Sequence, residues 1–263
     1  MKLKIYHIDA FTDQLFKGNP ASVIPLENWL SEELMQKIAF ENNQPETAFY
    51  VKESENFHIR WFTPLYEVDL CGHATIASAF VLFNFQNYNQ EEIIFNSRSG
   101  ILKVSKKENL FTLDFPSVGR EKVEAPNGMI IGLGSSVPLE VYKVNDDYMA
   151  VFESEKEVEN IKPDFAILKK LEGRGIIITA KGDHVDFVSR FFTPKFGIDE
   201  DPVTGSTHTK LIPFWAEILE KNELIAKQIS ARGGDLWCKL EGDRVKISGH
   251  AKLYMSGEIE IEG

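Results

Sequence analysis

The sequence predicts an α+β protein of two pseudo-symmetric domains, each a barrel-like, mostly antiparallel sheet wrapped around a central apolar helix. Three observations lead to this fold class. A segment that begins at Arg60 recurs in altered form at Arg190, close to half the chain length further on. The segments 74–85 and 206–222 have the length and apolar character of helices that are buried on most sides. Many other apolar segments are short and rich in β-branched and aromatic residues, as strands are.

The internal repeat consists of RWFTPLYEVDLCGHAT (60–75) and RFFTPKFGIDEDPVTGSTH (190–208). In each copy, an Arg-aromatic-Phe-Thr-Pro segment leads through an acidic turn to a glycine and then to a helical pattern. Such a long-range repeat indicates a duplicated structural unit. We therefore expect an N-terminal barrel domain of residues 1–117 plus about 252–263, and a C-terminal barrel domain of residues 118–251.

In the first half, residues 31–43 have the pattern of an amphipathic helix. Ser31 is a suitable N-cap, and Glu32 and Glu33 place negative charge in the positive first turn. Strands are expected over 3–11, over 57–63, and as three short strands within 91–116.

The second half repeats this theme. The helix expected over 206–222 contains Pro213, which should kink the helix or mark a restarted first turn. Residues 116–130 are the expected linker between the domains. Strands are expected over 174–180, over 183–194, and as a chain of strands within 228–263.

Composition excludes several classes of function. With 43% hydrophobic and 26% charged residues among 263, the chain has the composition of a soluble globular protein. A net charge of −11 without a Lys/Arg-rich run argues against nucleic acid or an anionic membrane as partner. Two cysteines imply no disulfide framework, the start lacks a signal-peptide pattern, and the apolar segment 74–85 is too short to span a bilayer. We expect a cytoplasmic protein.

The two glycine turns of the repeat indicate where a ligand could bind. Gly72 and Gly205 each precede a helix, whose first backbone N–H groups have no partner within the helix. If the pseudo-symmetry brings both helix starts to one cleft, each dipole contributes roughly 0.3–1 kcal/mol to binding an anion. A small carboxylate would be held there despite the net charge of −11. In the alternative interpretation, both glycines only end strands and Ser206 only caps a helix.

Five sequence blocks follow one another over nearly the whole chain: GNPASV (18–23), NQPETAF (43–49), FTPLYEVDLCGHAT (62–75), FTPKFGIDEDPVTGSTH (192–208) and SARGG...RVKISGHA (230–251). In sequence and in order they resemble the PhzF-like phenazine-biosynthesis isomerase family. CGHAT and DPVTGS together make the resemblance specific, whereas either one alone does not. The resemblance implies a fold like that of diaminopimelate epimerase, with the active site between two related domains, and a homodimer.

The resemblance also implies a mechanism. Isomerases of this family use no cofactor and move a proton on a cyclic amino-acid-like substrate, which is trans-2,3-dihydro-3-hydroxyanthranilate in the founding case. Their general base corresponds to Glu46 here, and His73 and Asp201 would assist proton movement and orient the substrate. The residues assigned to substrate binding, chiefly of its carboxylate, are Gly72, Gly205, Ser206 and Asn19.

Each of the three acid/base residues also has a structural interpretation. A single glutamate at a loop–strand junction, such as Glu46, is usually solvated. His73, at the start of a buried helix, could be a structural hydrogen-bonding residue, and Asp201 before Pro202 is a common turn acid. Their grouping around two related glycine turns favours the functional interpretation.

Cys71 offers a second chemistry. Diaminopimelate epimerase works with two thiols, the first in a Cys-Gly-Asn block that CGH resembles, but the matching position of the second copy is Thr204. A two-thiol racemisation is therefore not expected. Cys71 at a helix start could still be a reactive thiol in a single-thiol epimerase, or it could be inert packing.

Two further alternatives are a metal site and a binding protein without catalytic turnover. Ligand-type residues occur at His73, His208, Glu200 and Asp201, but no metal-binding spacing connects them, so no metal is expected. A protein that binds or senses a small carboxylate without turnover is the alternative from another functional class. CGHAT also departs from the phenazine enzyme, in which Ala precedes Gly-His, so the resemblance bears on the chemistry more than on the substrate.

Overall fold

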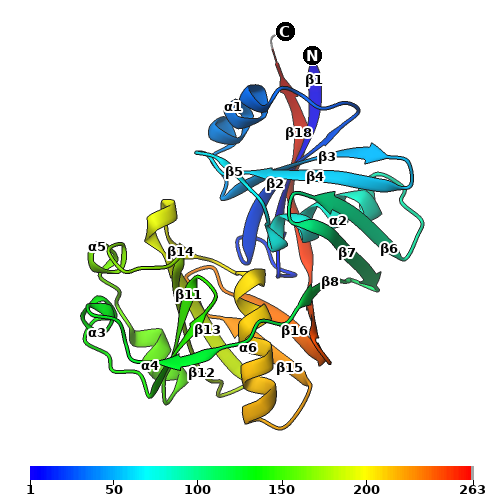
Figure 1. Ribbon diagram of the computed structural model, residues 1–263. Helices are drawn as coiled ribbons and strands as arrows, with labels where there is room; N and C mark the ends of the chain where they lie inside the picture. Colours follow the sequence, from blue (N-terminus) through cyan, green and yellow to red (C-terminus); the bar gives the residue numbers. More distant parts are fainter. Residues whose placement is uncertain (262–263) are drawn as a thin grey trace. The chain divides into compact units, whose positions relative to one another are not determined.

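The computed structural model describes residues 1–261, which form two compact units (Figure 1). Unit 1 contains Met1–Asp114 and the described residues from Ser248 on, and unit 2 contains Phe115–Ile247. The boundaries between the units, after Asp114 and before Ser248, lie a few residues before the expected ones, after residue 117 and before about residue 252. Within the described residues, no helix combines the length and the apolar character needed to span a bilayer.

Unit 1 contains one short outer helix, one central helix and a set of mostly antiparallel strands. Helix α1 (Glu32–Asn42) starts as expected, because Ser31 accepts a hydrogen bond from the backbone of Leu34. The central helix is α2 (Gly72–Phe85). The strands are β1 (Lys2–Ala10), β2 (Asn19–Leu26), β3 (Glu46–Glu53), β4 (Asn56–Phe62), β5 (Glu67–Val68), β6 (Glu92–Ser97), β7 (Gly100–Lys107), β8 (Leu110–Pro116, which continues into unit 2) and β18 (Ala251–Glu260).

Unit 2 has the same plan with more helices on its outside. Its central helix is α6 (Gly205–Ile218). The outer helices are α3 (Met129–Gly132), α4 (Glu155–Asn160), α5 (Phe165–Leu168) and the 3₁₀ turn η1 (Pro194–Phe196). The strands are β9 (Glu121–Val123), β10 (Glu140–Val144), β11 (Asp147–Val151), β12 (Gly175–Lys181), β13 (Phe187–Thr193), β14 (Ile198–Asp201), β15 (Glu223–Gln228), β16 (Gly234–Glu241) and β17 (Arg244–Gly249).

Strand pairing repeats from unit 1 to unit 2 in order and in direction. In unit 1, β1 is antiparallel to β18 and β2, β2 is parallel to β3, and β3 is antiparallel to β4. Strand β4 is then antiparallel to β5 and parallel to β6, which is antiparallel to β7. In unit 2, β10 takes the place of β1, with β9 and β11 beside it, and β11 to β16 follow in the same pattern. The duplication expected from the repeated motif is present strand for strand.

The repeated motif corresponds to a repeated ion pair. Arg60 on β4 donates two hydrogen bonds to Glu67 on β5, at 2.7 and 2.6 Å. Arg190 on β13 donates two to Glu200 on β14, at 2.8 and 2.9 Å. Each guanidinium also lies over the ring of the motif's phenylalanine, 5.2 and 4.9 Å from its centre. The Arg-x-Phe pattern and the acidic turn are therefore retained because they close the same hairpin in both units.

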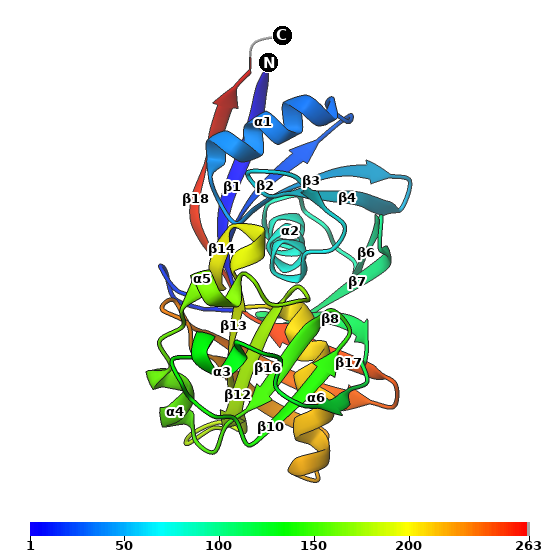
Figure 2. The ribbon, with the colours of Figure 1, turned by 60° about the vertical axis from the view of Figure 1, so that its left-hand side comes forward.

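Helix α2 is surrounded by the strands of unit 1, which Figure 2 shows in a view close to the helix axis. Every residue from His73 to Ala79 is buried. Since an α-helix makes a turn every 3.6 residues, a buried run of this length covers all faces of the helix. This burial is the reason that the segment lacks a polar face in the sequence.

Helix α6 continues through Pro213 and does not restart at that residue. Proline has no N–H to donate to the carbonyl four residues earlier, which belongs to Thr209. The backbone N–H of Val118 donates to that carbonyl at 3.0 Å. A hydrogen bond from outside the helix thus replaces the missing one, and the helix keeps its length.

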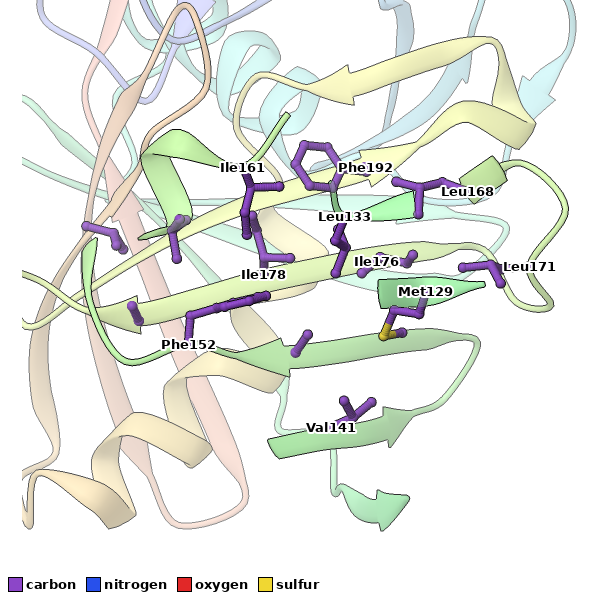
Figure 3. Packing of buried hydrophobic residues seen from close by; sticks show 14 residues of the cluster. Met129, Leu133, Val141, Phe152, Ile161, Leu168, Leu171, Ile176, Ile178 and Phe192 are labelled. Carbon is purple, nitrogen blue, oxygen red and sulfur yellow. The ribbon is translucent and has the colours of Figure 1, made fainter. Parts of the chain in front are cut away.

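The outer helices cover the faces of the sheets opposite the central helices. Thr179 of β12 accepts a hydrogen bond from Trp215 of α6, whereas its neighbour Ile178 points to the other face, where α3 and α5 pack (Figure 3). A corresponding outer cluster in unit 1 places Met35 of α1 against Phe49 of β3. Each unit therefore has two apolar layers, and the central helix belongs to only one of them.

The segment expected as a linker is partly regular structure. Residues 121–123 form β9, which pairs antiparallel with β10 and is an edge strand of unit 2. A strand of three residues is too short to show an alternating pattern in the sequence, so the prediction of a plain linker over 116–130 was wrong for these residues.

Candidate active site

Strand β3 and helix α2 bring Glu46 and His73 together in unit 1. Glu46 is the first residue of β3, and His73 is the second residue of α2. Their side chains meet with Glu46 Oε2 3.0 Å from His73 Nε2. The imidazole is 6% exposed and the carboxylate 15% exposed, so the pair is largely withdrawn from water but can still be reached.

Asn19 orients the ring of His73 from the opposite edge. The amide Nδ2 of Asn19, on β2, lies 3.1 Å from His73 Nδ1. Because an amide nitrogen can only donate, Nδ1 accepts in this arrangement, and the proton of the neutral ring is then on Nε2, beside Glu46. If the ring takes up a second proton, rotation of the amide presents Oδ1 to Nδ1–H. Asn19 can thus serve both protonation states of the histidine.

The surroundings of His73 favour its protonated form. Burial acts to lower the pKa of the imidazole, but the neighbouring Cys71 and Glu46 outweigh burial and raise the pKa of His73 well above its ordinary value. Nε2 carries a proton in both states of the ring and can donate it to the Glu46 carboxylate at 3.0 Å. This arrangement is suited to receiving and returning a proton.

Cys71 is close to the pair but does not have the character of a reactive thiolate. Its Sγ lies 3.5 Å from His73 Nδ1 and 3.9 Å from Nε2. Burial, with help from the charge of Glu46, raises the pKa of Cys71 to about 11. Its position before the first turn of α2 does not offset this burial, so the thiol is protonated at neutral pH.

In unit 2, Asp201 is held at the start of α6. The hydroxyl of Thr204, the residue that precedes Gly205, donates to the Asp201 carboxylate at 2.5 Å. Gln228 accepts from the backbone N–H of Thr204 at 2.9 Å and donates to the backbone carbonyl of Asp201 at 2.7 Å. Asp201 is thus fixed to the glycine turn by its side chain and its backbone.

Ser206 belongs to a buried charge cluster that the sequence did not predict. Arg174 donates to the hydroxyl of Ser206 at 3.0 Å and makes two hydrogen bonds, of 2.9 and 2.6 Å, with the fully buried carboxylate of Asp147. Lys210, one turn further along α6, donates to the same carboxylate. Two cations surround one buried anion here, directly behind the serine.

The charge cluster changes the protonation behaviour of its cations. Burial acts to lower the pKa of Arg174, but Asp147 outweighs it, and the pKa is raised. Burial lowers the pKa of Lys210, against the pull of the same carboxylate. The one available signal in the sequence was Asp147 itself, a charged residue that opens the apolar segment DYMAVF (147–152).

The four residues considered as possible metal ligands in the sequence have other partners in the structure. Glu200 pairs with Arg190, and His208 is fully buried with its Nδ1 2.8 Å from the carbonyl of Thr204. Burial lowers the pKa of His208 to about 4, so its ring is neutral. Within residues 1–261, the ligand atoms that do converge belong to Glu46, Cys71 and His73.

The fold places the chain in a structural class that includes amino-acid epimerases and racemases. A hydroxyproline epimerase from Agrobacterium vitis matches over 98% of this chain and 92% of that one, with a TM-score of 0.62 at 10% identity. At 10% identity, this similarity supports a common fold and no more. It agrees with the expected epimerase-like architecture of two barrel-like units, each with a central helix.

The chain belongs to the phenazine biosynthesis-like (PhzC-PhzF) family, whose model matches residues 8–257. It is 50% identical to an uncharacterised isomerase of Pseudomonas aeruginosa, over 99% of this chain and 100% of the relative. A human phenazine biosynthesis-like domain-containing protein is 38% identical over 98% of this chain and 99% of its own length. A PhzF-family structure from Enterococcus faecalis has a TM-score of 0.96 at 49% identity and covers 99% of this chain and 100% of its own. The chain is accordingly an isomerase of this family.

Proposed function

We propose that this isomerase moves a proton on a small cyclic amino-acid-like carboxylate without a cofactor, with Glu46 as general acid/base. The observation that carries the proposal is the 3.0 Å approach of Glu46 Oε2 to His73 Nε2, with Asn19 on the other ring nitrogen. A partly exposed carboxylate backed by a buried, tautomer-controlled imidazole can remove a proton from carbon and return it.

The proton balance of the proposed step is simple. Glu46 takes the proton as one C–H bond breaks, and the electron pair left behind is delocalised into the substrate. His73 stabilises the glutamate in both states, because Nε2 can donate to the carboxylate or share its proton. Glu46 then returns the proton to a different carbon or to the other face of the same carbon, and no electrons are gained or lost.

We assign the carboxylate of the substrate to the residues at the start of α6. Gly205 and Ser206 begin this helix, where the dipole favours a negative charge, and Arg174 adds a cation behind the serine hydroxyl. Asp201, held by Thr204, would orient an amino or hydroxyl group of the substrate. Gly72, at the corresponding place on α2, is assigned the same role as Gly205.

The test is proton NMR in D₂O with trans-2,3-dihydro-3-hydroxyanthranilate and a panel of cyclic amino acids. Wild-type protein should exchange or shift a proton on at least one compound, and Glu46→Gln should slow this by at least ~100-fold. Glu53→Gln, at the exposed far end of the same strand, is the matched control and should keep the wild-type rate. Equal rates for Glu46→Gln and wild type would remove Glu46 from the mechanism.

The same experiment separates two other functions. If no compound exchanges although one of them binds, the protein is a carboxylate-binding or sensor protein. If Cys71→Ala or thiol alkylation abolishes exchange while Glu46→Gln does not, the chemistry is that of a single-thiol epimerase. The pKa of Cys71, raised to about 11 by burial, supports tolerance of Cys71→Ala.

A further inference from the structure

Three donor atoms of different chemical type converge in unit 1. The carboxylate of Glu46, the imidazole of His73 and the thiol of Cys71 place one ligand atom each within 4.8 Å of the others. Oε2 of Glu46 is 3.0 Å from Nε2 of His73, and Sγ of Cys71 is 3.9 Å from the same nitrogen. Oxygen, nitrogen and sulfur therefore surround one small volume.

Two of the separations are close to those of donors that share one metal ion. With metal–ligand distances of about 2.0–2.3 Å and tetrahedral angles, neighbouring N, O and S donors lie roughly 3.4–3.6 Å apart. The observed 3.0 and 3.9 Å are a few tenths of an ångström to either side of this range. The sulfur lies 3.5 Å from Nδ1 and 3.9 Å from Nε2, so rotation of the Cys71 side chain towards the Nε2 side of the ring is needed for coordination.

A separate observation concerns the carboxylate oxygen itself. Oε2 of Glu46 is buried, and its neighbour on the histidine ring is Nε2, at 3.0 Å. A buried carboxylate oxygen is costly to leave uncompensated, and a bound cation would neutralise its charge.

Asn19 completes the arrangement as an orienting residue. A histidine that binds metal through Nε2 carries its proton on Nδ1 and donates it to a second-shell acceptor. The amide of Asn19 is 3.1 Å from Nδ1, and after amide rotation its Oδ1 becomes that acceptor.

We propose that Glu46, Cys71 and His73 form a three-ligand site for Zn²⁺, with the fourth coordination position open to water. A set of one thiolate, one imidazole and one carboxylate favours zinc over magnesium or calcium, which prefer oxygen ligands. Since the metal occupies Glu46 Oε2 and His73 Nε2, it blocks the proposed proton transfer and acts as an inhibitor. The binding of zinc does not depend on the proposed function.

The test uses Co²⁺ as a spectroscopic probe and Zn²⁺ in competition with a chromogenic chelator. Wild type should bind one ion, and the cobalt form should show a thiolate-to-cobalt charge-transfer band in the near ultraviolet. Cys71→Ala should lose that band and bind Zn²⁺ at least ~10-fold more weakly. Cys238→Ala removes the other buried cysteine, on β16 of unit 2, and should leave the band and the affinity unchanged.

Two further measurements keep the test decisive. Glu46→Gln changes a partly exposed side chain and should also weaken Zn²⁺ binding by at least ~10-fold, so the result does not depend on how well Cys71→Ala folds.

Absence of Zn²⁺ binding to wild type, or equal affinities of the wild type and both site variants, would overturn the site. If the site binds zinc but isotope exchange continues unchanged with Zn²⁺ bound, the inhibitory role is wrong. If no compound exchanges at all, the proposed function fails while the binding result stands.

Discussion

His73 Nε2 lies 3.0 Å from Glu46 Oε2, and this contact joins the start of the central helix of unit 1 to the start of a neighbouring strand. Both side chains are held by regular secondary structure and not by loops. The packing of α2 against β3 therefore sets where the two side chains start. The contact makes the protonation of His73 depend on the charge of Glu46.

The first prediction concerns the titration of His73. Its pKa is raised well above the ordinary value, against burial, by Cys71 and Glu46, so Glu46→Gln should lower the pKa of the ring. NMR titration of ¹⁵N-labelled histidine measures this shift directly. Because the folded-state pKa is the higher one, the stability that His73 contributes is present below pH ~6.5 and is lost as the pH rises through the folded pKa. An unchanged titration in Glu46→Gln would show that Glu46 does not set the charge of the ring.

The second prediction concerns Ser206 and substrate binding. Ser206→Ala should raise KM for a carboxylate substrate by about 10- to 100-fold with a smaller effect on kcat, since one hydrogen bond to a charged group is lost. Arg174 should keep its place, because its two hydrogen bonds to Asp147 remain. Steady-state isotope exchange measures both constants. Ser154→Ala, at the start of the outer helix α4, is the control, and a fall in kcat alone would place Ser206 in the chemical step.

The third prediction concerns the buried carboxylate of unit 2. Asp147→Asn leaves Arg174 and Lys210 facing each other without an anion and should lower the free energy of unfolding by about 3–5 kcal/mol. Urea unfolding of unliganded protein measures the change. Asp146→Asn, the exposed neighbour, should change it by no more than about 0.5 kcal/mol. Similar values for the two variants would mean that the buried cluster does not stabilise unit 2.

The fourth prediction concerns His208 and acid stability. Burial lowers its pKa to about 4, so the unfolded chain binds the proton more tightly. The stability that neutral His208 provides is complete above pH ~6.5 and falls as the pH drops towards 4, by up to about 3 kcal/mol. His208→Asn should show a shallower loss of stability between pH 7 and 4, as measured by urea unfolding at several pH values. His184→Asn changes an exposed histidine of the same unit and should keep the wild-type pH dependence.

The sequence predicts those features that repeat or that follow local periodicity. Arg60 and Arg190 lead to the duplication, the apolar run from Ala74 leads to the central helix, and the loop–strand junction at Glu46 is where β3 begins. These features depend on residues close in the chain or on a motif that occurs twice. Predicting these features required no knowledge of side-chain contacts.

The parts that could not be predicted depend on long-range contacts. Arg174 and Lys210 meet Asp147 across 27 and 63 positions of the chain, and no local pattern connects them. The raised pKa of Cys71 results from tertiary burial, whereas its sequence position before a helix suggested the opposite direction. The hydrogen bond from Val118 that replaces the one missing at Pro213 likewise depends on tertiary structure.

The strand-for-strand duplication has a consequence for how the chain evolved its chemistry. Glu46 begins β3 opposite Ala21, and Gly175 begins β12 opposite Asp147, so Glu46 and Gly175 descend from the same ancestral position.

The central helices contain a second pair of equivalent positions in the two halves. His73 and Ser206 are each the second residue of their helix, so Glu46 and His73 of one half correspond to a glycine and a serine in the other. A Cβ at Gly175 would lie 2.5 Å from the carbonyl oxygen of Phe192, so no side chain can be restored there without displacing backbone. The two copies have therefore diverged at this position in a way that a single substitution of Gly175 cannot reverse without a shift of the backbone.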